Sequence, residues 1–305
     1  MADWSVADIP SQAGKLAVIT GATGGLGYQT ALALAKARAE VVLTGRNPAK
    51  GSEAIAKIRD QFPDARIGFE AVDLASLASI SDFARRFAAE RRSLDLLVNN
   101  AGVMALPTRQ TTTDGFEMQF GTNYLGHYAL TAQLLPLLRN APHARVVNLS
   151  SIAHRTGFIH FSDLQGERLY SPWKAYNQSK LAMLIFALEL QRRSDAAGWN
   201  LVSNAAHPGW ARTDLLANGP GFGLFSLASG FAAPIFSHSA ESGALPTLFA
   251  ATSAQAKGGG YYGPNGFSEL RGPPAPARIM PQARDKATAE KLWTVSQQLT
   301  GVSFK

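Results

Sequence analysis

The sequence predicts an α/β fold built on a doubly wound parallel sheet. Short apolar runs alternate with longer segments of helical periodicity along most of the 305 residues. The apolar runs lack polar alternation, which is typical of parallel strands covered by helices on both faces. The alternation of strands and helices therefore predicts one sheet of about seven parallel strands. The length fits a single domain, 1–305, because α/β folds of this size often form one unit.

The strands and helices are placed from composition and from their end signals. The expected strands are the apolar or β-branched runs at 16–20, 41–44, 66–72, 94–99, 144–150, 200–206 and 259–263. The expected helices cover 26–39, 48–61, 76–90, 114–139, 172–193, 239–252 and 286–299. Asn47-Pro48 and Ser171-Pro172 are clear helix starts, because each pairs an N-cap residue with a proline. The proline-rich segment 271–281 is expected to be an extended tail.

Composition argues against several classes of protein. There is no cysteine, which excludes disulfides, thiol catalysis and thiolate metal sites. The net charge is +7, but the basic residues are scattered over alanine-rich helical segments, so we expect no nucleic-acid surface. The six histidines show no metal-binding spacing, so no metal site is predicted. An uncharged apolar run of about 18 residues and a signal-peptide pattern are both missing, which indicates a cytoplasmic protein that is not inserted in a membrane.

A glycine-rich turn follows the first expected strand and opens the first expected helix. The sequence TGATGGLG carries Gly21, Gly24, Gly25 and Gly27. Glycines let the backbone turn sharply and approach a phosphate, and the next helix supplies free N–H groups at its N-terminus. A glycine pattern alone is weak evidence, but the strand–turn–helix context is the one that a Rossmann-type dinucleotide site requires.

The end of the second strand distinguishes the two nicotinamide cofactors. In NAD-binding proteins, an acidic residue about 20 residues after the glycine turn bonds the 2′-hydroxyl of the adenosine ribose. This chain has Arg46 at that place and no acid. A guanidinium suits a 2′-phosphate, so the sequence favours NADP(H) over NAD(H). The alternative is that Arg46 is merely exposed in a loop.

Tyr176 and Lys180 lie four residues apart near the start of an expected helix, which puts them on one helix face. The ammonium of Lys180 is expected to lower the pKa of the Tyr176 phenol and to make it a better proton donor and acceptor near neutral pH. The spacing by itself also fits a lysine that merely reaches from the core to the surface.

Five motifs occur in order along the chain: TGATGGLG, LVNNAG (97–102), TNYLGHY (122–128), VVNLSSIAH (146–154) and YNQSK (176–180). AAHPGWARTDL (205–215) follows the sixth expected strand. Together they resemble the short-chain dehydrogenase/reductase family over about residues 14–265, with 266–305 as a C-terminal extension. NYLGHYALT and DLQGERLYSPWKAYNQSKLA are similar to the retinol-dehydrogenase-like and protochlorophyllide-reductase-like branch. The light-dependent enzymes of that branch use characteristic cysteines, which this chain lacks.

The resemblance implies an oxidoreductase that interconverts an alcohol and a ketone or aldehyde. Carried over by position, its catalytic residues are Asn123, Ser151, Tyr176 and Lys180. Tyr176 would be the general acid/base, Ser151 would donate to the substrate oxygen, and Asn123 would hold a water beside Lys180. Ser151 is preferred to Ser150 because the family usually uses the second serine of such a pair. The implied cofactor-binding residues are Gly21, Thr23, Gly24, Leu26, Arg46, Asp73, Leu74, Asn100, Ala101, Gly102, Tyr176, Lys180, Pro208, Gly209 and Thr213.

Two segments are expected to shape the substrate pocket. The long stretch between Ser151 and Tyr176 leaves room for an extra loop or short hairpin over the site. Residues 214–238 are mostly apolar and contain several glycines. This composition fits a lid over an apolar ligand, an ordinary core helix or the contact surface of a homo-oligomer. The predicted partner is a small-molecule substrate, namely an apolar or aromatic alcohol, ketone or aldehyde.

Two other functions stay open from the sequence. A nucleotide-sensing protein would keep the cofactor site without the chemistry, although the intact Asn, Ser, Tyr and Lys set argues against this. A sugar-nucleotide epimerase or dehydratase has a similar fold. Such proteins usually carry TGxxGxxG and a larger C-terminal domain, whereas this chain carries TGxxxGxG and NNAG.

Overall fold

The predicted doubly wound sheet is present in the computed structural model, which describes residues 3–210 and 239–305. Within these residues one sheet has the strand order β3-β2-β1-β4-β5-β6-β7-β8. The strands are β1 Leu16–Thr20, β2 Glu40–Gly45, β3 Ile67–Ala71, β4 Leu96–Asn99, β5 Arg145–Leu149, β6 Val202–Ala206, β7 Tyr261–Pro264 and β8 Pro274–Pro276. Strands β1 to β7 pair in parallel, as predicted.

The eighth strand is the part of the sheet that the sequence did not predict. β8 pairs antiparallel with β7, and Gly263 lies opposite Ala275. Its prolines led us to expect an extended tail, because proline cannot donate a hydrogen bond within a sheet. Proline is tolerated at this place because β8 forms the edge of the sheet.

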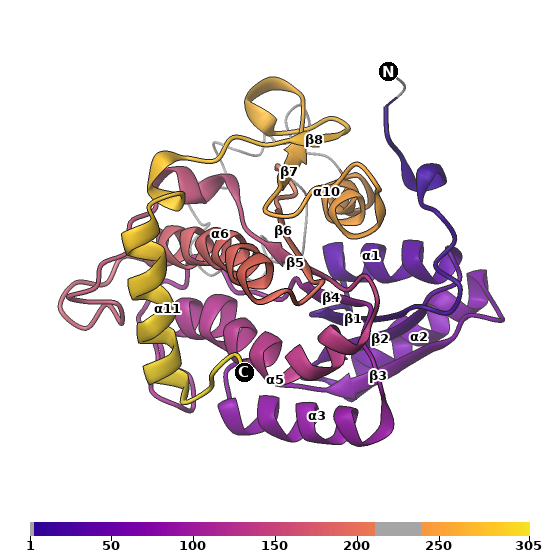
Figure 1. Ribbon diagram of the computed structural model, residues 1–305, viewed down its shortest axis with the longest axis horizontal. Helices are drawn as coiled ribbons and strands as arrows, with labels where there is room; N and C mark the ends of the chain where they lie inside the picture. The colour runs from indigo at the N-terminus through magenta and orange to yellow at the C-terminus, as the bar shows by residue number, and fades with distance from the viewer. Residues whose placement is uncertain (1–2, 211–238) are drawn as a thin grey trace.

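Helices cover both faces of the sheet (Figure 1). They are α1 Gly25–Lys36, α2 Pro48–Gln61, α3 Leu77–Glu90, α4 Met118–Phe120, α5 Gly126–Asn140, α6 Pro172–Ala197, α10 Ala240–Thr252 and α11 Lys286–Thr300. One apolar core lies between the sheet and α1, α2 and α10, and the other lies between the sheet and α3, α5 and α6. Leu16 and Val18 of β1 enter one core while Ala17 and Ile19 enter the other, which is the alternation that a doubly covered strand requires.

The expected helix over 114–139 begins later and is interrupted. The carboxylate of Glu117 accepts hydrogen bonds from the N–H groups of Gln119 and Phe120, so it caps the short helix α4. One π-helical turn, η2 Gly121–Leu125, then joins α4 to α5. Such turns widen a helix locally and are frequent at functional sites. Asn123 lies within this turn.

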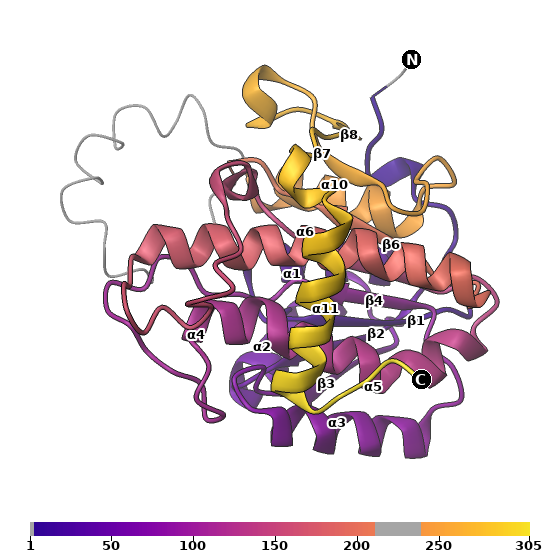
Figure 2. The same ribbon diagram turned by 60° about the vertical axis from the view of Figure 1, so that its left-hand side comes forward.

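The C-terminal segment packs on the rest of the fold. Helix α11 crosses over α5 and α6 (Figure 2). The ring of Trp293 lies 5.3 Å from that of Tyr128 and 5.9 Å from that of Phe186. The ring of Phe304 lies 4.5 Å from Trp293 and completes this aromatic cluster. No helix within residues 3–210 and 239–305 has the length and apolar character needed to cross a membrane. The expected lid, 214–238, lies outside the described residues.

Candidate active site

The predicted site residues gather at the carboxyl-terminal edge of the sheet. The chain continues from β1 to β2 on one side and from β4 to β5 on the other, so the topology changes direction between β1 and β4. In doubly wound folds a ligand crevice forms outside the strand ends at such a point. The glycine turn, the NNAG motif and the Ser150-Ser151 pair directly follow β1, β4 and β5.

The glycine turn has the geometry of a phosphate-binding loop. Gly21 and Gly25 have φ values of +63° and +55°, which L side chains rarely adopt. A Cβ atom on Gly27 would lie 2.5 Å from the side-chain nitrogen of Asn100, which is too close. The glycine turn and the NNAG motif can therefore approach each other only because residue 27 has no side chain. No side chain caps the N-terminus of α1, where Gly24 is the N-cap residue. Its first N–H groups therefore suit the pyrophosphate of a dinucleotide.

The NNAG motif is bonded to the end of β1. The backbone N–H groups of Asn100 and Ala101 donate to the Thr20 hydroxyl oxygen at 2.8 and 2.9 Å. The Asn100 side chain donates to the Thr20 carbonyl oxygen at 2.7 Å. These hydrogen bonds hold the glycine turn and the NNAG motif together.

His127 connects the end of β1 to the π-helical turn η2 that carries Asn123. The sequence analysis did not predict this role. Its Nδ1 lies 2.8 Å from the Asn123 carbonyl oxygen, and its Nε2 lies 2.9 Å from the Thr20 hydroxyl. A carbonyl oxygen only accepts, so Nδ1 carries the proton and Nε2 accepts from Thr20. Burial lowers the pKa of His127 to about 4, which keeps this tautomer neutral. The i,i+4 spacing of Asn123 and His127 was the available signal.

The side chain of Asn123 holds the segment that follows NNAG. Its Oδ1 accepts from the N–H of Val103 at 2.7 Å, and its Nδ2 donates to the Val103 carbonyl oxygen at 2.9 Å. The same Nδ2 lies 2.9 Å from the hydroxyl of Ser179 on α6. A Cβ atom on Gly102 would lie 3.0 Å from Asn123 Oδ1 and 3.6 Å from Lys180 Nζ. Gly102 therefore lies next to both Asn123 and Lys180. The water molecule that Asn123 is expected to hold beside Lys180 stays a prediction.

Tyr176, Lys180 and Ser151 lie together where α6 meets the end of β5. The Tyr176 phenol is buried and lies within hydrogen-bonding reach of the Ser151 side chain. Lys180 Nζ lies 5.8 Å from the centre of the Tyr176 ring and donates to the Leu149 carbonyl oxygen at 3.0 Å. The Ser150 hydroxyl instead donates to the Lys180 carbonyl oxygen at 2.8 Å. The second serine of the pair is thus the one beside the phenol.

The pKa of Tyr176 shifts in the direction opposite to the one expected from the sequence. Burial raises it to about 12, because a phenolate loses its hydration inside the protein. Burial also lowers the pKa of Lys180 to about 8. The hydrogen bond with the Ser151 side chain lowers the pKa of Tyr176, but by less than burial raises it. In the chain by itself, Tyr176 is therefore protonated at neutral pH and is able to donate a proton.

The predicted cofactor residues beyond β1 line the same edge. Gly45, at the end of β2, lies close to the glycine turn, because a Cβ atom at this position would be 3.4 Å from the Thr23 methyl group. Arg46 is the next residue and is exposed. The carboxylate of Asp73 accepts from the N–H of Ala75 at 3.0 Å just after β3. The other predicted residues here are the glycine-turn residue Leu26, the buried Leu74, and Pro208 and Gly209 after β6. Thr213 lies outside the described residues.

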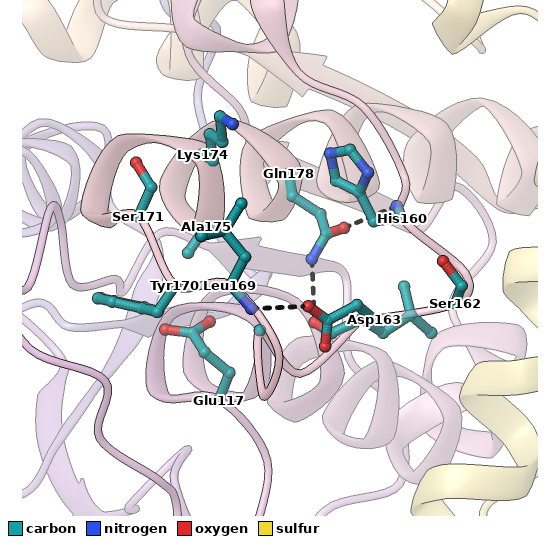
Figure 3. Close-up of a pocket in the computed structure, with 12 residues that line it drawn as sticks. Glu117, His160, Ser162, Asp163, Leu169, Tyr170, Ser171, Lys174, Ala175 and Gln178 are labelled. Atoms are coloured by element: carbon teal, nitrogen blue, oxygen red, sulfur yellow. Dashed lines mark hydrogen bonds between the residues drawn. The ribbon is translucent and has the colours of Figure 1, made fainter.

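The segment between Ser151 and Tyr176 forms a loop. It starts with one 3₁₀ turn, η3 Ile152–Thr156, and residues 157–171 contain no strand. Gln178 of α6 holds this loop, accepting from the N–H of His160 and donating to the Leu164 carbonyl oxygen (Figure 3). A cavity of about 130 Å³ lies between the loop and α6, and none of the predicted catalytic residues lines it. The described residues contain no group of three acidic or histidine side chains that could bind a metal.

Comparisons with known proteins agree with this geometry. The family model described as short chain dehydrogenase matches residues 15–220. A polyprenol dehydrogenase of Mus musculus is 42% identical over 298 residues, which cover 96% of this chain and 86% of that protein. Retinol dehydrogenase 13 of Mus musculus is 42% identical over 308 residues, covering 98% and 87%. The crystal structure of an uncharacterised protein from Mycobacterium paratuberculosis is 39% identical, with a TM-score of 0.82 and full coverage of both chains.

Proposed function

Because this chain belongs to the short-chain dehydrogenase family and is an NAD(P)-dependent alcohol or carbonyl oxidoreductase, we propose that it uses NADP(H) and acts on an apolar substrate. We further propose that Tyr176 is its general acid/base. One observation carries the assignment: the Tyr176 phenol lies beside the Ser151 hydroxyl, with Lys180 one turn further along α6, at the sheet edge that bears the glycine turn.

In the direction of reduction, the substrate needs a proton at oxygen and a hydride at carbon. The bound nicotinamide supplies the hydride. Tyr176 donates its phenolic proton to the carbonyl oxygen, which becomes the hydroxyl of the alcohol. The Ser151 hydroxyl donates a hydrogen bond to the same oxygen while negative charge develops on it. In the reverse direction, the Tyr176 phenolate removes the proton from the alcohol.

Lys180 supports this step through its charge and its free donors. An ammonium group has three N–H donors, and Lys180 directs one of them to the Leu149 carbonyl oxygen. The remaining donors can bond the ribose of the cofactor. With a pKa of about 8, Lys180 keeps its positive charge at neutral pH. That charge favours the transient phenolate left on Tyr176 after proton donation.

The preference for NADP(H) rests on Arg46. This residue is exposed at the end of β2, directly after Gly45, which borders Thr23 of the glycine turn. If the glycine turn binds the cofactor phosphates, as we propose, the Arg46 guanidinium would be close enough to reach a 2′-phosphate. A guanidinium binds phosphate through paired hydrogen bonds, and it would find no such partner on the free 2′-hydroxyl of NAD(H).

The proposal of an apolar substrate rests on Trp173 and on the relatives. Trp173 is 50% exposed, and its ring packs edge-to-face against Tyr176 with centres 6.1 Å apart. A large exposed indole next to the proton donor offers an apolar contact for a substrate. The relatives named for polyprenol and retinol act on long apolar alcohols. We infer a substrate of that chemical class, an apolar primary alcohol or its aldehyde.

The test is turnover of NADPH with a panel of apolar aldehydes, aromatic aldehydes and ketones, followed by the loss of NADPH absorbance. Retinal, farnesal and benzaldehyde cover the relevant lengths and shapes. We expect turnover that increases with apolar chain length and that is faster with NADPH than with NADH. Tight NADPH binding without turnover of any compound would favour the non-catalytic sensor instead.

A further inference from the structure

The carbonyl oxygen of Ser151 is held by three hydrogen-bond donors. The backbone N–H of His154 donates to it at 3.0 Å, as the 3₁₀ turn η3 requires. The His154 ring places Nδ1 at 2.7 Å from the same oxygen. The phenol of Tyr261, on β7, donates to it at 3.2 Å. The turn itself needs only the first of these bonds, so the two side chains add a constraint that the local fold does not demand.

The two side chains are buried and belong to different elements. His154 is fully buried and Tyr261 is 2% exposed. Their rings pack edge-to-face with centres 5.2 Å apart. Behind Tyr261, the ring of His207 lies 5.1 Å away, and its Nε2 lies 3.0 Å from the carboxylate of Glu269. Arg155, next to His154, pairs with the same carboxylate at 2.7 Å. The C-terminal segment thus closes the back of this cluster.

The chemistry of His154 uses one ring nitrogen only. The Ser151 carbonyl oxygen can only accept, so Nδ1 must carry the proton. Nε2 is buried and has no hydrogen-bond partner among residues 3–210 and 239–305. Burial lowers the pKa of His154, which keeps the ring neutral. A side chain with a donor at the Nδ1 position would therefore replace everything that His154 gives to Ser151.

Ser151 is fixed on its other side as well. The N–H of the preceding Ser150 donates to the Ala206 carbonyl oxygen at 2.9 Å, within the register of β5 and β6. With both neighbouring peptide groups held, the direction of the Ser151 Cα–Cβ bond is set. That direction limits where the Ser151 hydroxyl can point, and the same hydroxyl oxygen accepts from the N–H of Ala153 at 3.2 Å.

We propose that His154 and Tyr261 are positioning residues that hold the Ser151 backbone so that its hydroxyl faces the substrate oxygen and Tyr176. This inference rests on the proposed function, in which Ser151 bonds the developing oxyanion. Neither residue touches the reacting atoms. Their loss acts on kcat, because a misdirected Ser151 hydroxyl fails in the transition state while the cofactor still binds.

The experiment uses the two amides as isosteres of the two ring nitrogens. In His154→Asn, the side-chain nitrogen can take the place of Nδ1. In His154→Gln, it reaches the place of Nε2 and cannot bond the Ser151 carbonyl oxygen. The full chain is assayed with NADPH and the best aldehyde of the panel. We expect His154→Asn to keep kcat within about threefold of wild type and His154→Gln to lose about tenfold, the effect of one hydrogen bond.

Tyr261→Phe gives a second variant that keeps the ring and its packing. We expect kcat to fall by about three- to tenfold, with the Kd for NADPH and the unfolding midpoint close to wild type. Equal kcat values for His154→Asn and His154→Gln, together with a wild-type kcat for Tyr261→Phe, would overturn the positioning role. A loss of NADPH affinity that accounts for the whole effect would overturn it too. A wild-type protein that turns over no aldehyde would instead overturn the proposed function.

Discussion

Tyr176→Phe removes one oxygen atom from a buried side chain, and its effects on folding and on chemistry are of very different size. The phenol lies within hydrogen-bonding reach of the Ser151 side chain, and the loss of one hydrogen bond there costs about 1 kcal/mol of folding free energy. For the unfolding entropy of 305 residues, that lowers the unfolding midpoint by about 2 °C. General acid–base catalysis typically increases the rate by a factor of about 10²–10⁴, which lowers the activation free energy by about 3–5 kcal/mol.

The assay measures kcat for an apolar aldehyde with NADPH, the Kd for NADPH, and the unfolding midpoint. We expect kcat to fall by at least about a hundredfold while the Kd stays within about twofold. Tyr170→Phe is the matched control, because it also removes a phenolic oxygen. The Tyr170 hydroxyl bonds the Leu106 carbonyl oxygen at 2.7 Å and accepts from Gln119 at 3.1 Å.

The control loses as many hydrogen bonds as the test variant, or more, and should keep kcat within about twofold of wild type because no reacting atom depends on it. Residual activity of Tyr176→Phe within about tenfold of wild type would refute the role of the phenol as proton donor. Equal losses of kcat in both variants would show that reduced stability, and not chemistry, controls turnover.

Three further predictions concern Lys180, the glycine turn and Arg46. The pKa of Lys180 is about 8 in the folded chain, and its ordinary value is 10.5. Between these two pH values the unfolded state binds more protons than the folded state, so stability rises with pH. The free energy of unfolding of wild type should therefore rise by about 3 kcal/mol relative to that of Lys180→Met as pH increases through this window. Chemical denaturation of both proteins at neutral pH and above pH 10.5 measures this change. A difference in unfolding free energy between wild type and Lys180→Met that does not change with pH would contradict the prediction. Gly27→Ala should cost about 1–3 kcal/mol of stability by overpacking and should weaken NADPH binding. The control Gly68→Ala, whose added Cβ meets nothing within 4 Å, should do neither in denaturation and binding titrations. Arg46→Asp should weaken NADPH binding by about 10- to 100-fold and NADH binding much less; unchanged selectivity in a fluorescence titration would exclude Arg46 as the reader of the 2′-phosphate.

Local patterns were sufficient to predict most of the fold. The seven parallel strands lie where the sequence has short, mainly apolar or β-branched runs, and the helix starts at Asn47-Pro48 and Ser171-Pro172 agree with α2 and α6. The pattern failed where a long-range contact decides the structure. β8 forms only because β7 offers it a partner at the sheet edge. The π turn η2, which contains Asn123, also had no signal in the sequence pattern.

In the candidate site, too, local motifs predicted the residues involved, whereas the contacts between distant residues could not be predicted. Motif order identified the residues around Tyr176, but it could not reveal which atoms meet. Burial of Tyr176 reversed the expected direction of its pKa shift, and burial is a property of the whole fold. The parts played by His127 and His154 depend on Thr20 and on Tyr261, which are more than a hundred residues away in the sequence. A sequence pattern carries no signal for such pairs.

The most direct test of the account is the transfer of deuterium from cofactor to substrate. Wild-type protein is incubated with an apolar aldehyde and NADPH that is deuterated at the transferred position of the nicotinamide ring, and the product is examined by mass spectrometry. The account predicts an alcohol with one deuterium on the former carbonyl carbon, and almost no such product from Tyr176→Phe. Saturating NADPH binding with no labelled alcohol from any aldehyde of the panel would contradict the account.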